Sequence, residues 1–397
     1  MRLYENEFIK FDDNTDNQKN LSDEDINKKY LLGESRIVTE QGRYPLDTIP
    51  VMIDSGKYKL NPDFQRRHRW NNQKKSRLIE SFIMNVPIPP IFLYEDDYSH
   101  YEVMDGLQRL TAIDQFYKNK FKLEGLEYWE ELNGRTYEEL PIKIKQGIDR
   151  RYISSLILLQ ETAKSKSEAR RMKQIVFERI NNGGVKLEGQ ETRNALYNGP
   201  MNELCLSLSD NRYLKILIGV PIEDSYQNHI DYENDLMENE LYSKMKDVEY
   251  VLRFFAMRQI DGYQGRTLNE FFDYYMKKAN LYNENLLNDL KAEFERIIEF
   301  AYDLLGENAF YLWRKRNGKW NWLNKATTTV FDAIMYVLSE LFEHKEKLLL
   351  INASIQEDLI KFYEKNYGYF EGRNNNKSNI EQRRELYRDF FTSYLEE

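Results

Sequence analysis

Hydrophobic and polar positions follow two different patterns along this chain. Up to about residue 200, short apolar runs alternate with polar turns and short amphipathic stretches, which predicts strands between helices. The clearest expected strands are 91–94 and 101–104, joined as a hairpin, and 153–159. Beyond residue 200, apolar residues recur at helical spacing almost throughout. The long helices expected there are 240–258, 268–280, 284–305, 324–343 and 353–366.

This change of pattern predicts an α+β fold and three segments. Residues 1–40 are polar and lack hydrophobic periodicity, so we expect an irregular N-terminal lead-in. Residues 41–220 are expected to form a domain with a small mixed sheet and helices. Residues 221–397 are expected to form a mostly α-helical C-terminal domain.

Composition narrows the class of protein. Of 397 residues, 41% are hydrophobic and 31% charged, which is typical of a soluble globular protein. No apolar run approaches the roughly 18 residues of a membrane helix, and polar sequence follows Met1 where a signal peptide would be apolar. The one cysteine, Cys205, excludes an intramolecular disulfide framework. We therefore expect a cytoplasmic protein with no membrane partner.

The net charge of −9 argues against a generic polyanion binder, but the charge is unevenly distributed. Residues 57–80 contain eight Lys or Arg against two acidic residues, and residues 164–194 contain eight against four. Basic stretches are most often solvated surface. Here both stretches also contain polar motifs, which favours a shared anionic ligand.

The pentapeptide Asp105-Gly106-Leu107-Gln108-Arg109 stands between an expected strand and an expected helix. A helix N-terminus presents unpaired backbone N–H groups and a partial positive charge, which suits a phosphate group. Gly106 permits close approach of the backbone to a ligand, and Arg109 can bind a phosphate through two parallel hydrogen bonds. An ordinary turn in which Asp105 caps the helix is the alternative.

Other polar clusters are weaker signals. Arg also occurs with amide or acidic side chains at 64–67, at 177–184 and at 190–194. Each of these clusters alone is typical of a surface ion pair or of the end of a helix. Aromatic and basic residues interleave from Trp313 to Trp322, a mixture that suits nucleic acid, although a loop between helices with buried Trp anchors is favoured. The four histidines lack the spacing of an HNH nuclease motif, and no Walker loop is present.

Several of these stretches recur in the same order in one known family. They are 61–66, 78–81 with 87–91, 105–109, and 177–181 with 190–194. Over about residues 45–220, the chain resembles the N-terminal, GmrS-like domain of modification-dependent restriction proteins, also known as domain of unknown function 262. The resemblance implies a ParB/sulfiredoxin-like fold and the Mg²⁺-dependent hydrolysis of GTP or another nucleoside triphosphate. The family's usual turn is Asp-Gly-Gln-Gln-Arg, so Leu107 departs from it.

The resemblance also implies roles for individual residues. Gln108 and Arg109 would hold the β- and γ-phosphates, and Asp105 would position the metal ion or the attacking water. The residues expected to complete the nucleotide site are Gln65, Arg66, Gly106, Glu178, Arg179 and Asn181. The residues expected to contact DNA are Arg67, Arg69, Lys74 and Lys75.

The leading hypothesis is a nucleotide-hydrolysing, DNA-associated subunit of a prokaryotic phage-defence or restriction system. Because no HNH motif is present, we expect it to gate a partner nuclease or effector rather than to cut DNA itself. One alternative is a DNA-binding or assembly module without hydrolysis, and another is a metal-dependent DNA nickase. Formation of a homo-oligomer is left open.

Overall fold

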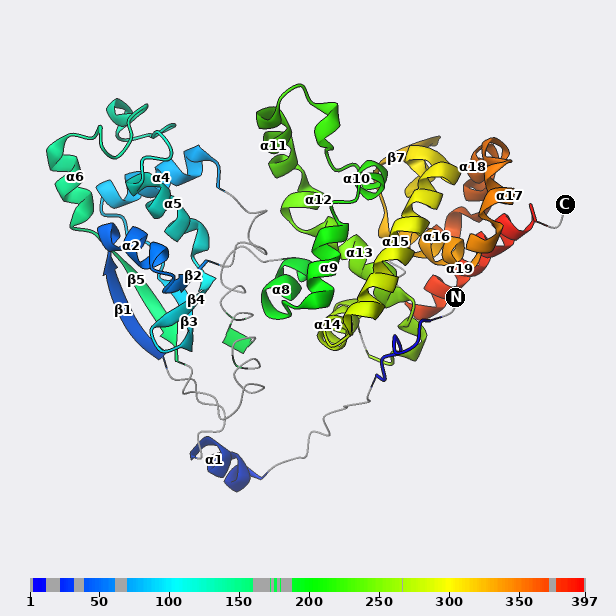
Figure 1. The fold of residues 1–397 in the computed structure, drawn as a ribbon, viewed down its shortest axis with the longest axis horizontal. Helices are drawn as coiled ribbons and strands as arrows, with labels where there is room; N and C mark the ends of the chain where they lie inside the picture. Colours follow the sequence, from blue (N-terminus) through cyan, green and yellow to red (C-terminus); the bar gives the residue numbers. More distant parts are fainter. Residues whose placement is uncertain are drawn as a thin grey trace. The chain divides into compact units, whose positions relative to one another are not determined.

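The chain divides into two compact units in the computed structural model (Figure 1). Residues 17–187 form the α+β unit, and residues 1–16 together with 188–397 form the helical unit. The structure describes residues 3–11, 22–31, 39–60, 70–159, 172, 175–176, 179, 188–265, 267–370 and 376–395. The predicted α+β class is confirmed, with a small mixed sheet followed by a mostly helical part.

The described part of the α+β unit contains one five-stranded mixed sheet in the order β1-β5-β3-β4-β2. Strands β1 and β5 pair antiparallel, as do β3 and β4, whereas β3–β5 and β2–β4 pair parallel. The predicted hairpin of β3 and β4 is confirmed. The strands are β1 (Thr39–Pro45), β2 (Tyr58–Lys59), β3 (Ile91–Asp97), β4 (His100–Asp105) and β5 (Tyr152–Leu158).

One face of this sheet packs against helices. Ile91, Leu93 and Val103 belong to the core, as do Ile153 and Ile157 of β5. These positions alternate along their strands, so their side chains share a face. The helices of this unit are α1 (Asp23–Leu31), α2 (Ile49–Asp54), α4 (Asn72–Ile83), α5 (Leu107–Tyr117) and α6 (Ile142–Asp149). Helix α5 follows β4 after a single residue, which places the start of α5 at the end of the sheet's second-to-last strand.

The helical unit is organised around α15, the longest of its helices. Asn283 caps α15 by accepting a hydrogen bond from the N–H of Leu286, and an apolar stripe including Leu290, Phe294 and Ile297 is fully buried. The larger helices are α8 (Gly189–Leu196), α9 (Pro200–Leu208), α10 (Arg212–Ile218), α11 (His229–Glu238), α13 (Lys246–Met257), α14 (Leu268–Ala279), α15 (Glu284–Leu305), α16 (Thr328–Glu340), α18 (Asn352–Phe370) and α19 (Lys377–Thr392). The short helices are α12 (Glu240–Ser243) and α17 (Lys345–Leu349). Within the described ranges, no helix is both long and apolar enough to span a bilayer.

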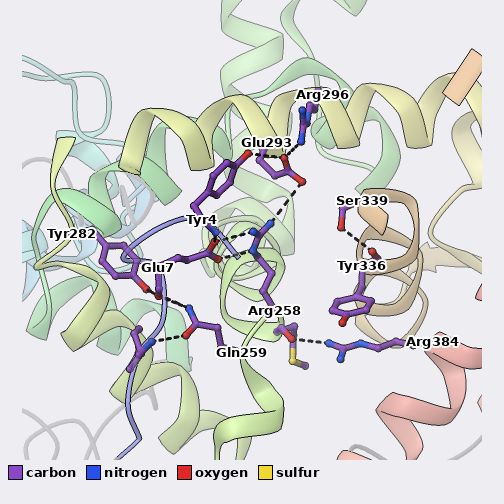
Figure 2. A network of polar contacts seen from close by, with 12 residues as sticks. Tyr4, Glu7, Arg258, Gln259, Tyr282, Glu293, Arg296, Tyr336, Ser339 and Arg384 are labelled. Atoms are coloured by element: carbon purple, nitrogen blue, oxygen red, sulfur yellow. Dashed lines mark hydrogen bonds and ion pairs between the residues drawn. The ribbon is translucent and has the colours of Figure 1, made fainter. Parts of the chain in front are cut away.

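The N-terminal segment differs from the irregular lead-in that we expected. Residues 3–11 contain no helix or strand, yet Glu7 and Ile9 are buried against the helical unit, and Figure 2 shows Tyr4 and Glu7 in contact with it. Glu7 is fully buried and accepts hydrogen bonds from Nε and Nη2 of Arg258 at 2.6 and 2.9 Å. Gln259 donates to the backbone carbonyl of Glu7 at 2.9 Å. A second difference is α1, which begins where Ser22 accepts a hydrogen bond from a backbone N–H in the first turn.

Two further differences concern boundaries and strands. The units separate after residue 187 rather than near 220, because α8 is bound to the helical unit through buried side chains. Where we favoured a loop around Trp313 and Trp322, a hairpin forms from β6 (Tyr311–Arg316) and β7 (Lys319–Ala326). Its Trp side chains do serve as anchors, as described below.

Candidate functional site

The candidate site lies where strand β4 passes into helix α5. Gly106 has φ +95°, in the left-handed region that favours glycine. A Cβ atom at this position would lie 2.4 Å from Cγ2 of Ile91 on the neighbouring strand β3. Gly106 occupies the N-cap position of α5 with no side-chain cap, so the alternative in which Asp105 caps the helix is wrong. The N–H groups of the first turn of α5 therefore have no partner within the helix.

Asp105 and Arg109 form an ion pair across this turn. Nη2 of Arg109 lies 2.7 Å from Oδ2 of Asp105, and the two side chains are 12% and 43% exposed. Nη1 of Arg109 donates to the carbonyl oxygen of Pro89 and, at 3.4 Å, to that of Pro90. Burial lowers the pKa of Arg109 below its ordinary value, and the Asp105 carboxylate opposes that shift. Arg109 thus connects the end of β4, the start of α5 and the Pro-Pro segment before β3.

The side chains of Leu107 and Gln108 have different surroundings. Leu107 is buried in the core of the α+β unit. Oε1 of Gln108 accepts a hydrogen bond from the backbone N–H of Trp70 at 3.1 Å. Gln108 therefore binds the backbone at Trp70, just before α4, while Leu107 packs into the core.

Some of the other expected site residues can be placed. Lys74 is exposed on the first turn of α4. Lys75 donates to Oδ1 of Asn72 at 3.2 Å and lies 5.4 Å from the ring centroid of Phe121. Arg179 is exposed and helical. The expected residues that lie outside the described ranges are Gln65, Arg66, Arg67, Arg69, Glu178 and Asn181.

Helix α4 contains a buried carboxylate for which the sequence pattern indicated no role. Oε1 of Glu80 accepts hydrogen bonds from the backbone N–H groups of residues 127–129 at 2.8–3.1 Å. One turn earlier, Oγ of Ser76 accepts from the N–H of Glu124 at 3.0 Å. These two polar side chains hold the segment that follows α5 against α4. Their spacing of four residues on an otherwise apolar helix face was the available signal.

The polar motif at 190–194 lies on α8 and is mostly buried in the helical unit. Arg193 is fully buried and donates to Glu249 on α13 at 2.7 Å and to Asp273 on α14 at 3.2 Å. Its Nε donates to Oε1 of Gln190 at 2.9 Å. Two carboxylates thus neutralise this cation, so Arg193 joins three helices instead of serving an anionic ligand.

The structure restricts where a metal ion could bind. Among the described residues, no group of three His, Cys, Asp or Glu side chains is placed to hold one. Cys205 is buried, which raises the pKa of its thiol, in agreement with a core residue. A cavity of about 370 Å³ lies in the helical unit beside Trp322 and Gln356.

Comparison with known proteins connects this turn with a family. Residues 49–198 of the 397-residue chain match the family model described as GmrSD restriction endonuclease, N-terminal domain. The matched range contains the turn at 105–109 and ends just after α8. No curated protein and no solved structure shows a significant match. The ParB/sulfiredoxin-like arrangement therefore stays a prediction.

Proposed function

We propose that the chain is a nucleotide-dependent, DNA-associated component of a restriction system, on the premise that residues 49–198 match the N-terminal domain of GmrSD restriction endonucleases. In this proposal, the α+β unit binds the phosphates of a ribonucleoside triphosphate at the turn of residues 105–109 and hydrolyses it with Mg²⁺. Hydrolysis would then gate a partner effector that acts on DNA. The observation that supports the proposal is the position of Arg109 on the first turn of α5, next to Asp105.

The local geometry favours a phosphate ligand. The left-handed Gly106 starts α5 without a capping side chain, so its first N–H groups can donate to an anion. Arg109 adds a fixed positive charge beside these groups, and its guanidinium is held by two backbone carbonyls. Phosphoryl transfer depends on such positioning and charge rather than on a covalent nucleophile.

In the proposed mechanism, phosphate and Asp105 compete for the same guanidinium group. Both are anionic acceptors of its hydrogen bonds, and the Asp105 side chain is partly exposed. A phosphate that takes the place of the carboxylate on Arg109 would free Asp105 to bind Mg²⁺ or to orient water. Among the described residues no group of three acidic, His or Cys side chains is placed to hold the ion, so phosphate oxygens would supply ligands beside Asp105, as is usual for Mg²⁺. The ion would neutralise charge between the phosphates.

The test is phosphate release from each of the four common ribonucleoside triphosphates with Mg²⁺, with and without DNA. Wild type is compared with Arg109→Ala, Asp105→Asn and the control Arg77→Ala, which removes an exposed cation of α4 in the same unit. We expect hydrolysis of one nucleotide that both site variants abolish and the control retains. Equal rates in the wild type and both site variants would refute the role of the turn.

A second candidate function is a DNA-binding or assembly module without hydrolysis. The observation that favours it is the closed set of contacts around Arg109, which is satisfied by Asp105 and two prolyl carbonyls without any ligand. In this case the ion pair only stabilises the turn. Absence of phosphate release for all four nucleotides, together with DNA binding that weakens as salt rises, would support this candidate.

A further inference from the structure

The hairpin of β6 and β7 is a basic element in an acidic chain. Residues 311–326 contain five Lys or Arg and no Asp or Glu, whereas the chain has a net charge of −9. Its two-residue loop, Asn317-Gly318, has φ values of +52° and +81°, as a tight hairpin turn of the I′ type requires. The result is a regular two-stranded ribbon with a compact tip.

Strand alternation places the tryptophans on one face of this ribbon. Trp313 and Trp322 are directly opposite each other, with ring centroids 5.4 Å apart. Nε1 of Trp313 donates to Glu364 of α18 at 3.1 Å, and the ring of Trp322 lies 6.0 Å from that of Tyr363. These contacts fasten one face of the ribbon to α18. The tryptophan rings are therefore engaged within the protein and do not form a free platform for stacking on bases.

The opposite face presents cations. Arg316 and Lys319 are exposed and directly opposite each other, and Arg314, two residues before Arg316, pairs with Asn321. Like charges opposite each other in a sheet are unfavourable unless an anion lies near them. Within the described ranges, none of the three cations forms an ion pair with a carboxylate. The Nε of Arg314 is buried without a hydrogen-bond partner among the described residues.

We propose that this cationic face, formed by Arg314, Arg316 and Lys319, binds the phosphate backbone of duplex DNA. Arg314 and Arg316 lie roughly 7 Å apart along the strand, a length over which each DNA strand presents about two phosphates. A two-stranded ribbon is also narrow enough to enter a major groove. Duplex is favoured over single-stranded nucleic acid because the aromatic side chains are occupied by α18. The proposal supplies the DNA contact of the proposed function but depends on the hairpin alone.

The test is binding of a short fluorescent duplex by the full chain, measured by anisotropy over a range of salt concentrations. The variant Arg316→Gln/Lys319→Gln is compared with the control Lys277→Gln/Lys291→Gln, which removes two exposed cations from α14 and α15 of the same unit. We expect the hairpin variant to weaken binding by on the order of tenfold. Its plot of log affinity against log salt should become shallower by about 2, because about 0.9 counterion is released per phosphate contact.

Several outcomes separate the possibilities. Equal weakening in the hairpin variant and the control would attribute binding to net charge and overturn the proposal, as would wild-type protein that does not bind duplex. Displacement of the duplex by polyglutamate at matched charge concentration would overturn it in favour of an acidic protein partner. The variant Arg316→Lys/Lys319→Arg keeps both positive charges, so affinity close to that of the wild type would support the proposal. Nucleotide hydrolysis should be unchanged in the hairpin variant, so failure of the nucleotide proposal leaves this test intact.

Discussion

The guanidinium group of Arg109 lies 2.7 Å from the carboxylate of Asp105, four residues earlier in the chain. The pair bridges the end of a strand and the start of a helix, and it adds the backbone carbonyls of Pro89 and Pro90 to the same contact. A single cation thus fixes three chain segments around the turn. The turn's stability and its proposed chemistry therefore depend on the same two side chains, and they need to be measured separately.

The ion pair should contribute to stability without any nucleotide. Asp105→Asn leaves the largely buried guanidinium of Arg109 without its counter-charge, and we expect unfolding free energy to fall by about 1–2 kcal/mol, since the carboxylate is partly exposed. Urea unfolding of Asp105→Asn, Arg109→Gln and the double variant measures the coupling. Strictly additive losses would show that the contact is not energetically important.

Glycine is required at position 106 for two reasons, its positive φ and the absence of space for a Cβ atom. Gly106→Ala should cost roughly 2–4 kcal/mol, combining left-handed backbone strain with a contact against Ile91. Gly56→Ala is the matched control, because φ there is +74° but nothing lies within 4 Å of the added atom. Thermal unfolding should show a clearly smaller loss for the control; similar losses would mean that the contact with Ile91 relaxes freely.

Leu107 stands where the turn of the family that this chain resembles usually has Gln. Because Leu107 is buried in the α+β core, Leu107→Gln should lower the unfolding free energy by about 1–3 kcal/mol. We expect the nucleotide hydrolysis rate per folded molecule to remain unchanged, since this side chain faces the core. Parallel measurement of unfolding and phosphate release tests both points, and a severalfold rise in hydrolysis would contradict the second.

Glu80 should stabilise the segment that follows α5 by accepting hydrogen bonds from its backbone. Glu80→Gln removes the charge that three consecutive backbone N–H groups share, so we expect faster amide hydrogen exchange at residues 127–129. Glu131→Gln, an exposed change in the same segment, should leave exchange there unaltered. Unchanged protection at these amides in Glu80→Gln would show that other contacts hold the segment.

The N-terminal segment should stabilise the helical unit through Glu7. Glu7→Ala leaves Arg258, whose side chain is 1% exposed, without the carboxylate that binds it in two places. Removing one partner of a buried pair typically costs about 3–5 kcal/mol. Thermal unfolding should therefore shift strongly for Glu7→Ala and little for Glu5→Ala, which alters an exposed neighbour. A small effect of Glu7→Ala would mean that Glu293, 3.7 Å from Arg258, suffices as its partner.

Local patterns predicted many elements correctly. The periodic apolar stretches at 268–280 and 284–305 correspond to α14 and α15, because helical periodicity depends on residues three and four apart. The apolar pattern does not predict strand β1, because most of its side chains are exposed, as in an edge strand. The hairpin of β6 and β7 was also missed, although Asn317-Gly318 is a strong hairpin signal.

The sequence by itself determined the α+β class, the long helices α13 to α16 and α18 of the helical unit, and the turn at 105–109 as the candidate site. Its motifs also indicated the family whose model matches residues 49–198. The tertiary structure alone decided which distant polar groups meet: Glu7 with Arg258, Arg193 with Glu249, and Arg109 with the backbone carbonyl of Pro89. The physical reason is that periodicity and turn propensity act over a few residues, whereas buried ion pairs join positions up to 251 residues apart and depend on the path of the whole chain.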